Sequence, residues 1–157
     1  KNQIAASAMR MSHWVFVAGF AAVAFGIAPA LRAIGSSVEP TSPLIWAILG
    51  IAMFGERYGA MHLQLYSTTN RIVWHLSAIR YFSGFLVGAL LLLPWLGLHA
   101  VPVALLVSCW TLYVGYCTRL SYSEMGVRMV AYERTVMLPA LAALLVCSFA
   151  ALGLPAR

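Results

Sequence analysis

The stretch that decides the fold class runs from residue 14 to residue 34 and reads WVFVAGFAAVAFGIAPALRAI. It contains a single charged residue, Arg32, close to its end. A helix rises about 1.5 Å per residue, so about 20 apolar residues are enough to cross the hydrocarbon core of a bilayer. The stretch therefore predicts a membrane-spanning helix.

Four more apolar stretches of similar character follow along the chain. They cover residues 43–65, 79–96, 101–117 and 136–154, with the second apolar early and polar late. Each is near the length that spans a bilayer, and only short polar connections separate most of them. We predict an all-α, polytopic bundle of about five transmembrane helices. Residues 1–157 form a single transmembrane domain.

The composition supports this fold class and argues against a nucleic-acid-binding protein. Of the 157 residues, 62% are hydrophobic and only 9% are charged, whereas soluble domains have about 25% charged residues. The formal net charge is +6, but the basic residues are mostly isolated arginines between apolar stretches. Nucleic-acid binding favours a clustered basic surface. We expect a lipid bilayer as the surroundings and no nucleic acid as a partner.

The arginines predict the orientation. Cytoplasmic ends of membrane helices are enriched in Lys and Arg. With a cytoplasmic N-terminus and five spans, seven basic residues fall on the inner side and two on the outer side. The inner set is Lys1, Arg10, Arg71, Arg80, Arg119, Arg128 and Arg134, and the outer set is Arg32 and Arg157.

The polar connections carry local signals for helix ends. Ser42 is suited to cap the second helix, with Pro43 at its first position. The polar residues 67–70 are suited to cap the third helix, and residues 97–99 form a tight hairpin. Between residues 119 and 134 we predict a short interfacial helix, begun by a capping box from Ser121 to Glu124 and supported by a Glu124–Arg128 pair.

The second apolar stretch holds the strongest candidates for function. Glu56, Arg57 and His62 interrupt it, and Gln64 shares a helical face with Arg57. Ionisable residues inside membrane segments usually face the bundle interior or water. They predict the polar wall of a substrate or ion pathway, in which Glu56 or His62 titrates. The alternative is a cytoplasmic helix end, where Arg57 extends to the interface beside Glu56.

Small residues mark predicted packing faces in the third and fourth helices. Gly84 and Gly88 form a G-x-x-x-G pattern, and Gly115 continues a small-residue stripe on the next helix. Such patterns allow close helix packing in membranes. Arg80 extends the stripe of the third helix toward the cytoplasm, where it either contacts a phosphate group or extends to the interface.

Motifs for catalysis and metal binding are not found in the sequence. The other histidines, His13, His75 and His99, fall at predicted interfaces without metal-ligand spacing. The three cysteines lie in apolar stretches as small buried side chains. We predict no metal, no cofactor and no enzymatic activity.

The order of these features resembles the C-terminal part of polysaccharide flippases of the multidrug/oligosaccharidyl-lipid/polysaccharide exporter superfamily. The similarity covers residues 14–119. It is carried by the turn LRAIGS (31–36), by the helix end HLQLYSTTNR (62–71), and by the hairpin PWLGL (94–98) followed by an Ala/Leu-rich helix ending in Tyr and Arg.

The resemblance implies transport of a lipid-linked oligosaccharide, an O-antigen or exopolysaccharide precursor, across a bacterial inner membrane by alternating access. It also implies that the chain is the C-terminal portion of a larger transporter, whose remaining helices would be its partners. A start at Lys1 rather than Met agrees with that expectation. Arg57 and Arg80 would contact the substrate pyrophosphate, with Glu56 and His62 as proton or cation partners.

Two other functions fit the same residues. A small integral-membrane subunit or assembly factor would use the small-residue stripes to dock partners. An integral-membrane enzyme on lipid substrates would use Glu56, Arg57 and His62, although such enzymes usually gather several acids or histidines at one membrane face. The chain has four acidic residues in all.

Overall fold

The structure is a computed structural model that describes residues 2–38, 42–126 and 129–152. These residues form an all-α bundle, as predicted, and contain no β-strand. The elements are α1 (Asn2–Ala33), α2 (Pro43–Ser67), α3 (Trp74–Leu96), η1 (Gly97–His99), α4 (Ala100–Ser108), η2 (Cys109–Val114), α5 (Gly115–Met125), α6 (Met129–Val136) and α7 (Leu138–Leu152).

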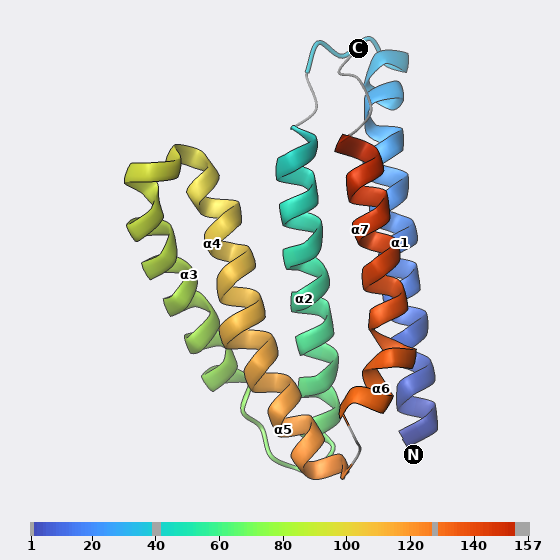
Figure 1. Ribbon diagram of the computed structural model, residues 1–157, viewed down its shortest axis with the longest axis vertical. Coiled ribbons are helices and arrows are strands. Elements are labelled where there is room, and N and C mark those ends of the chain that lie inside the picture. Colours follow the sequence, from blue (N-terminus) through green and yellow to red (C-terminus); the bar gives the residue numbers. More distant parts are fainter. Residues whose placement is uncertain (1, 39–41, 127–128, 153–157) are drawn as a thin grey trace.

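The helices run alternately up and down the bundle (Figure 1). α3 and α4 form a hairpin at one side, α1 and α7 lie together at the other, and α2 stands between them. α4 continues through η2, a segment of π-helix, into α5. The start of α1, the end of α2, the start of α3, the end of α5 and α6 all lie at one end of the molecule, which we call the basic end.

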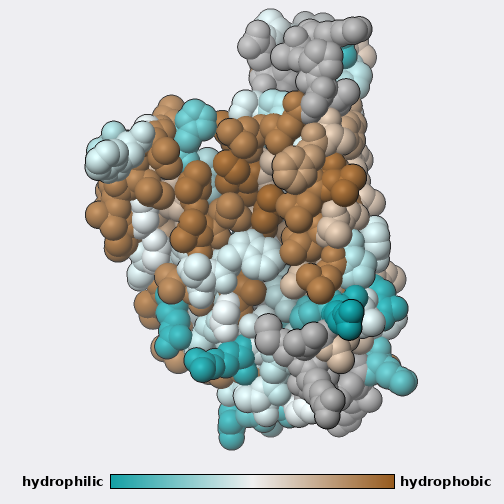
Figure 2. Space-filling view, viewed as in Figure 1, coloured by the Kyte–Doolittle hydropathy of each residue, from teal (hydrophilic) through white to brown (hydrophobic). Residues whose placement is uncertain are grey.

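The apolar helices are compatible with an integral membrane protein. Three stretches are long and apolar enough to cross a membrane, namely Gln3–Ala33, Pro43–Ser67 and Trp74–Glu124, and Leu138–Leu152 is a shorter apolar helix. The stretch Trp74–Glu124 contains both arms of the α3–α4 hairpin. Figure 2 shows a broad hydrophobic surface over the middle and upper part of the bundle, with hydrophilic residues gathered toward the basic end.

Two of the predicted helix ends are right and two are wrong. Ser42 caps α2, since its Oγ accepts a hydrogen bond from the Ile45 N–H at 3.3 Å. The hairpin at residues 97–99 is present as η1, with Gly97 at a positive φ of 55°. Residues 67–70 do not cap α3, which begins after Val73 without a side-chain cap. Instead the hydroxyls of Thr68 and Thr69 donate to carbonyls of α2 and end that helix.

The predicted capping box from Ser121 to Glu124 is also wrong. Both residues lie inside α5, because α4, η2 and α5 form one continuous helix. That helix ends at Gly126, whose left-handed conformation (φ 59°) suits glycine. Glu124 pairs with Arg71 at 2.9 Å. Arg128, the partner predicted for Glu124, lies outside the described residues, as do Lys1 and Arg157.

The core is built around α2, which contacts helices on both of its sides. Toward η2, Gly55 and Gly59 leave room for the rings of Trp110 and Tyr113. The Trp110 Nε1 donates to the Ile51 carbonyl at 3.1 Å, which fixes the indole against α2. Toward α1 and α7, the buried Phe54 packs in a cluster with Val17, Ala140 and Leu144.

Candidate functional site

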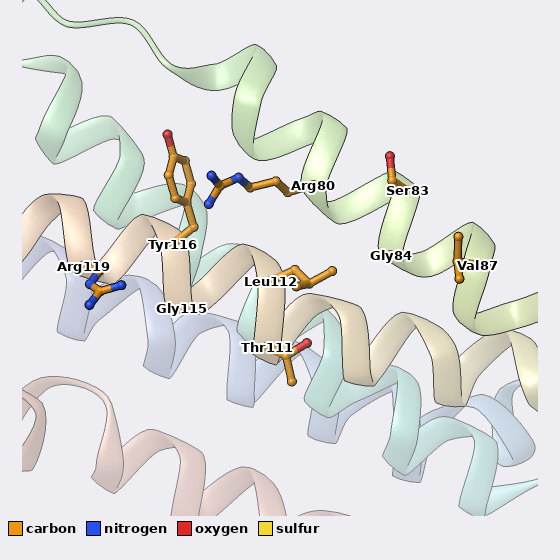
Figure 3. Close-up of a pocket in the computed structure, with 9 residues that line it drawn as sticks. All are labelled: Arg80, Ser83, Gly84, Val87, Thr111, Leu112, Gly115, Tyr116 and Arg119. Carbon is orange, nitrogen blue, oxygen red and sulfur yellow. The ribbon is translucent and has the colours of Figure 1, made fainter.

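A groove with two arginines runs along the side of the bundle between α3 and the continuous helix formed by η2 and α5 (Figure 3). It encloses about 680 Å³. Its lining residues are Arg80, Ser83, Gly84, Val87, Thr111, Leu112, Gly115, Tyr116 and Arg119. Arg80 and Arg119 lie toward the basic end of these helices, whereas Val87 and Leu112 line the groove farther along, so the groove is cationic at one end and apolar at the other.

Arg80 is held at the mouth of this groove by an aromatic ring. Its guanidinium carbon lies 4.2 Å from the centre of the Tyr116 ring (Figure 3), a cation–π contact that orients the side chain. Both Arg80 and Arg119 are exposed, and neither makes an ion pair with an acidic residue in the described part of the chain. Their donors are therefore available to an anion.

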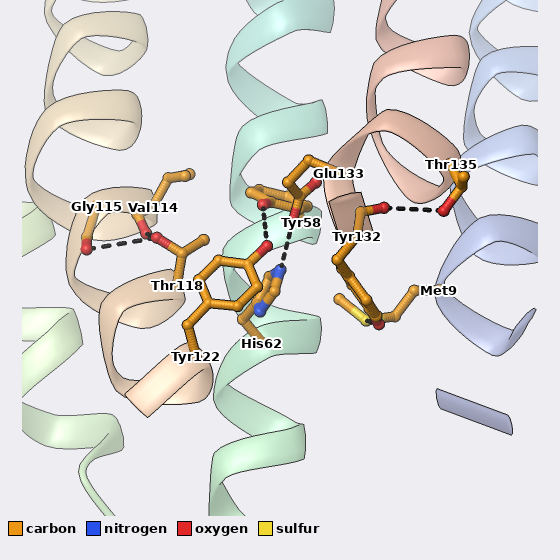
Figure 4. A network of polar contacts seen from close by, with 10 residues as sticks. All are labelled: Met9, Tyr58, His62, Val114, Gly115, Thr118, Tyr122, Tyr132, Glu133 and Thr135. Carbon is orange, nitrogen blue, oxygen red and sulfur yellow. Dashed lines mark hydrogen bonds and ion pairs between the residues drawn. The ribbon is translucent and has the colours of Figure 1, made fainter. Parts of the chain in front are cut away.

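A second polar site is buried at the basic end, where four helices meet (Figure 4). We call it the His–Glu cluster. It consists of His13 from α1, Tyr58 and His62 from α2, Tyr122 from α5, and Tyr132 and Glu133 from α6. The two histidines are fully buried and Glu133 is 5% exposed.

His62 and Glu133 form the centre of the His–Glu cluster. The Nε2 of His62 lies 3.6 Å from the Glu133 Oε1, and the ring of His62 lies edge-on to that of Tyr58 with centroids 4.6 Å apart. Above the pair, the hydroxyls of Tyr58 and Tyr122 are 3.4 Å apart. The Tyr132 hydroxyl donates to the Sδ of Met9 at 3.0 Å. Burial raises the pKa of Tyr132, which keeps it a neutral donor.

The structure separates Glu56 from Arg57. Both are exposed, but they lie on different sides of α2. Glu56 lines a small pocket of about 150 Å³ with Tyr81 and Tyr113, while the Nε of Arg57 donates to the Ser12 hydroxyl of α1 at 2.7 Å. No ion pair joins them among the described residues, so the two charges act separately.

The other predicted residues are divided among several environments. His62 lies in the His–Glu cluster and Gln64 is exposed. Gly84 packs closely on η2 and α4, because a Cβ there would meet Leu112 and would lie 2.8 Å from the Ser108 Oγ. Gly88 faces Ala104. A Cβ at Gly115 would meet only the Trp110 carbonyl oxygen, at 4.0 Å, and this glycine lines the groove.

Sequence reasoning missed Glu133 and assigned no function to His13. The residue Glu133 lies next to Arg134 in a polar stretch, which looks like a solvated interface. One feature of the sequence could have indicated its burial. Tyr132 and Glu133 come shortly before an apolar helix, and they lie on the buried face of a segment whose other face carries the exposed Arg134 and Thr135. A polar segment with one buried face indicates packing against the bundle.

Within the described residues, no group of three or more His, Cys, Asp or Glu side chains is arranged to hold a metal ion. No protein-family model, no curated protein and no solved structure matches the chain. The groove and the His–Glu cluster are therefore the features of the molecule that bear on its function.

Proposed function

We propose that this chain is part of an integral membrane transporter that moves a lipid-linked oligosaccharide across the bacterial inner membrane by alternating access. The observation that supports this most is the groove between α3 and α5, which is cationic at one end and apolar along its length. A lipid-linked phosphate has the same division, with an anionic head and a long hydrocarbon chain.

The charged end of the groove suits a phosphate or pyrophosphate. Guanidinium groups bind phosphate oxygens through charge-assisted, often bidentate, hydrogen bonds. Arg80 is already oriented by Tyr116, so less side-chain freedom is lost on binding. Arg119 lies on the opposite wall of the groove, which allows two cations to share one anion.

The apolar end of the groove suits the hydrocarbon chain. Val87 and Leu112 line it, and both side chains are more than 40% exposed. The outer face of α3 continues this apolar surface through the exposed side chains of Phe82, Leu86 and Leu90. In a bilayer this surface would face lipid, so the hydrocarbon chain could stay among lipid tails while the phosphate binds the arginines.

Transport by the reconstituted protein tests the proposal. We expect proteoliposomes to move a fluorescent polyprenyl-diphosphate-linked oligosaccharide between leaflets. The variants R80Q and R119Q should each lower the rate by about tenfold or more, because a hydrogen bond to a charged group contributes about 1.5–3 kcal/mol. R32Q is the matched control, since Arg32 is exposed in the last turn of α1, outside the groove.

Two results would contradict the transporter. If the protein binds the probe with arginine dependence but does not move it, the chain is a subunit that presents lipid to a partner. If R80Q, R119Q and R32Q all behave like the unmodified protein, the groove does not bind the substrate. The alternative of a small subunit or assembly factor is thus separated from transport by the same assay.

A further inference from the structure

The His–Glu cluster has no part in the groove and is better suited to another ligand, the proton. It gathers ionisable side chains from α2, α5 and α6 at one buried point (Figure 4). His62 and Glu133 come from α2 and α6, which are far apart in the sequence, and His13 comes from α1. None of these residues lines the proposed lipid-binding groove.

The charge balance of the cluster depends on a single proton. In the described part of the chain, neither nitrogen of His62 or His13 has a hydrogen-bond partner, and the Glu133 carboxylate interacts with the Tyr58 hydroxyl. The closest approach of opposite charge is the 3.6 Å contact of His62 with Glu133. A buried charge is costly unless it is paired, so the pair is favourable when it holds one proton and has no net charge.

The neighbouring groups do not replace that proton. On α2 and α5, the hydroxyls of Tyr58 and Tyr122 face each other. On α1, Arg10 is exposed. The guanidinium of Arg57, on α2, donates to the Ser12 hydroxyl of α1. On α6, Tyr132 donates to Met9 and Arg134 is exposed.

The short helix α6 carries Glu133 and is therefore the element that a change in the charge of the His62–Glu133 pair would affect. It follows the left-handed Gly126 at the end of α5 and precedes α7. It packs on α1 through a buried cluster of Met9, Tyr132 and Val136, against which Ala6 also packs. We propose that His62 and Glu133 bind one proton between them and that this proton controls the docking of α6 against α1 and α2.

The consequence is a proton-dependent change at the basic end. With the proton bound, the pair is neutral and α6 stays docked. When the proton leaves, the Glu133 carboxylate is left buried without a positive partner, and α6 moves so that Glu133 reaches water. Docking of α6 is therefore lost as the pH rises and this proton leaves.

Hydrogen–deuterium exchange of the full protein in detergent or nanodiscs tests this inference. As the pH is raised, the amides of residues 131–136 should lose protection by up to about tenfold per pH unit, as expected for one proton. Peptides from the middle of α1 provide the internal reference for the pH dependence of intrinsic exchange.

Two variants and one control complete the design. E133Q replaces the carboxylate by a neutral group of the same shape, so α6 should stay protected at every pH. H62N removes the imidazole that shares the proton, so the transition should move to a different pH. E56Q makes the same change at an exposed carboxylate and should behave like the unmodified protein.

The inference is overturned if α6 in the unmodified protein shows no pH dependence beyond that of the α1 reference. It is also overturned if E133Q keeps the same transition. The first result needs no variant, so a folding defect in E133Q or H62N would not protect the proposal.

Discussion

Glu133 shows what burial does to a single charged residue. Its carboxylate is almost inaccessible to water and faces His62, whereas Glu124 pairs with the exposed Arg71 at the surface. Removing Glu133 leaves the His62 imidazole buried without this contact, and an unsatisfied buried polar group costs about 1–3 kcal/mol. Surface pairs contribute much less, because water screens them.

We therefore expect E133A to lower the unfolding free energy by about 1–3 kcal/mol near neutral pH. E124A, the matched change at an exposed acid, should have little effect. Denaturant titration in detergent, followed by loss of helical circular dichroism, measures both. Equal stability of the two variants would mean that the His62–Glu133 contact does not contribute to the fold.

At the scale of helices, the close packing of α2 on η2 depends on glycine. A Cβ at Gly55 would lie 2.8 Å from the Trp110 Nε1 and 3.1 Å from the Cys109 Sγ. The indole cannot move away easily, because its Nε1 donates to the Ile51 carbonyl. The π-helical segment Cys109–Val114 brings both side chains to this face of α2.

The substitution G55A should therefore destabilise the bundle by about 1–3 kcal/mol through overpacking, which exceeds the gain of about 1 kcal/mol from alanine's helix propensity. G19A is the control, since nothing lies within 4 Å of a Cβ at Gly19 in α1. The temperature of thermal unfolding should be lower for G55A and unchanged or higher for G19A. A higher unfolding temperature for both variants would show that α2 and η2 can move apart at Gly55 without loss of stability.

The sequence predicted the elements better than their junctions, for a physical reason. Apolar length decides where helices lie, and Ser42 and Gly97 act locally, so these features were readable. The continuity of α4 through η2 into α5 was not readable. The polar composition after residue 117 suggested a helix boundary there, although no Gly or Pro ends the helix before Gly126. The His–Glu cluster depends on how α6 packs against α2, which no local pattern encodes.

At the scale of the whole molecule, the alternating helices bring most of the described arginines to one end. The connection between α2 and α3 and the end of α5 lie there, while η1 and the end of α1 lie at the opposite end (Figure 1). Arg71 is in that connection, and Arg119 is in α5. If the bundle spans a membrane, the enrichment of Lys and Arg on the cytoplasmic side makes the basic end cytoplasmic.

Single cysteines at the two ends test this orientation. Ile72, between α2 and α3, is 70% exposed, and Leu98, in η1, is 85% exposed. With the three native cysteines replaced by alanine, I72C should react with a membrane-impermeant maleimide only when the cytoplasmic face of sealed vesicles is accessible. L98C should react only from the other face, because α3 separates the two positions. The cysteine-free parent is the control for background labelling. Reaction of both positions from one face would mean that α3 does not cross the membrane, and the groove beside it would then lie outside the bilayer, where a lipid-linked substrate could not enter it from the side.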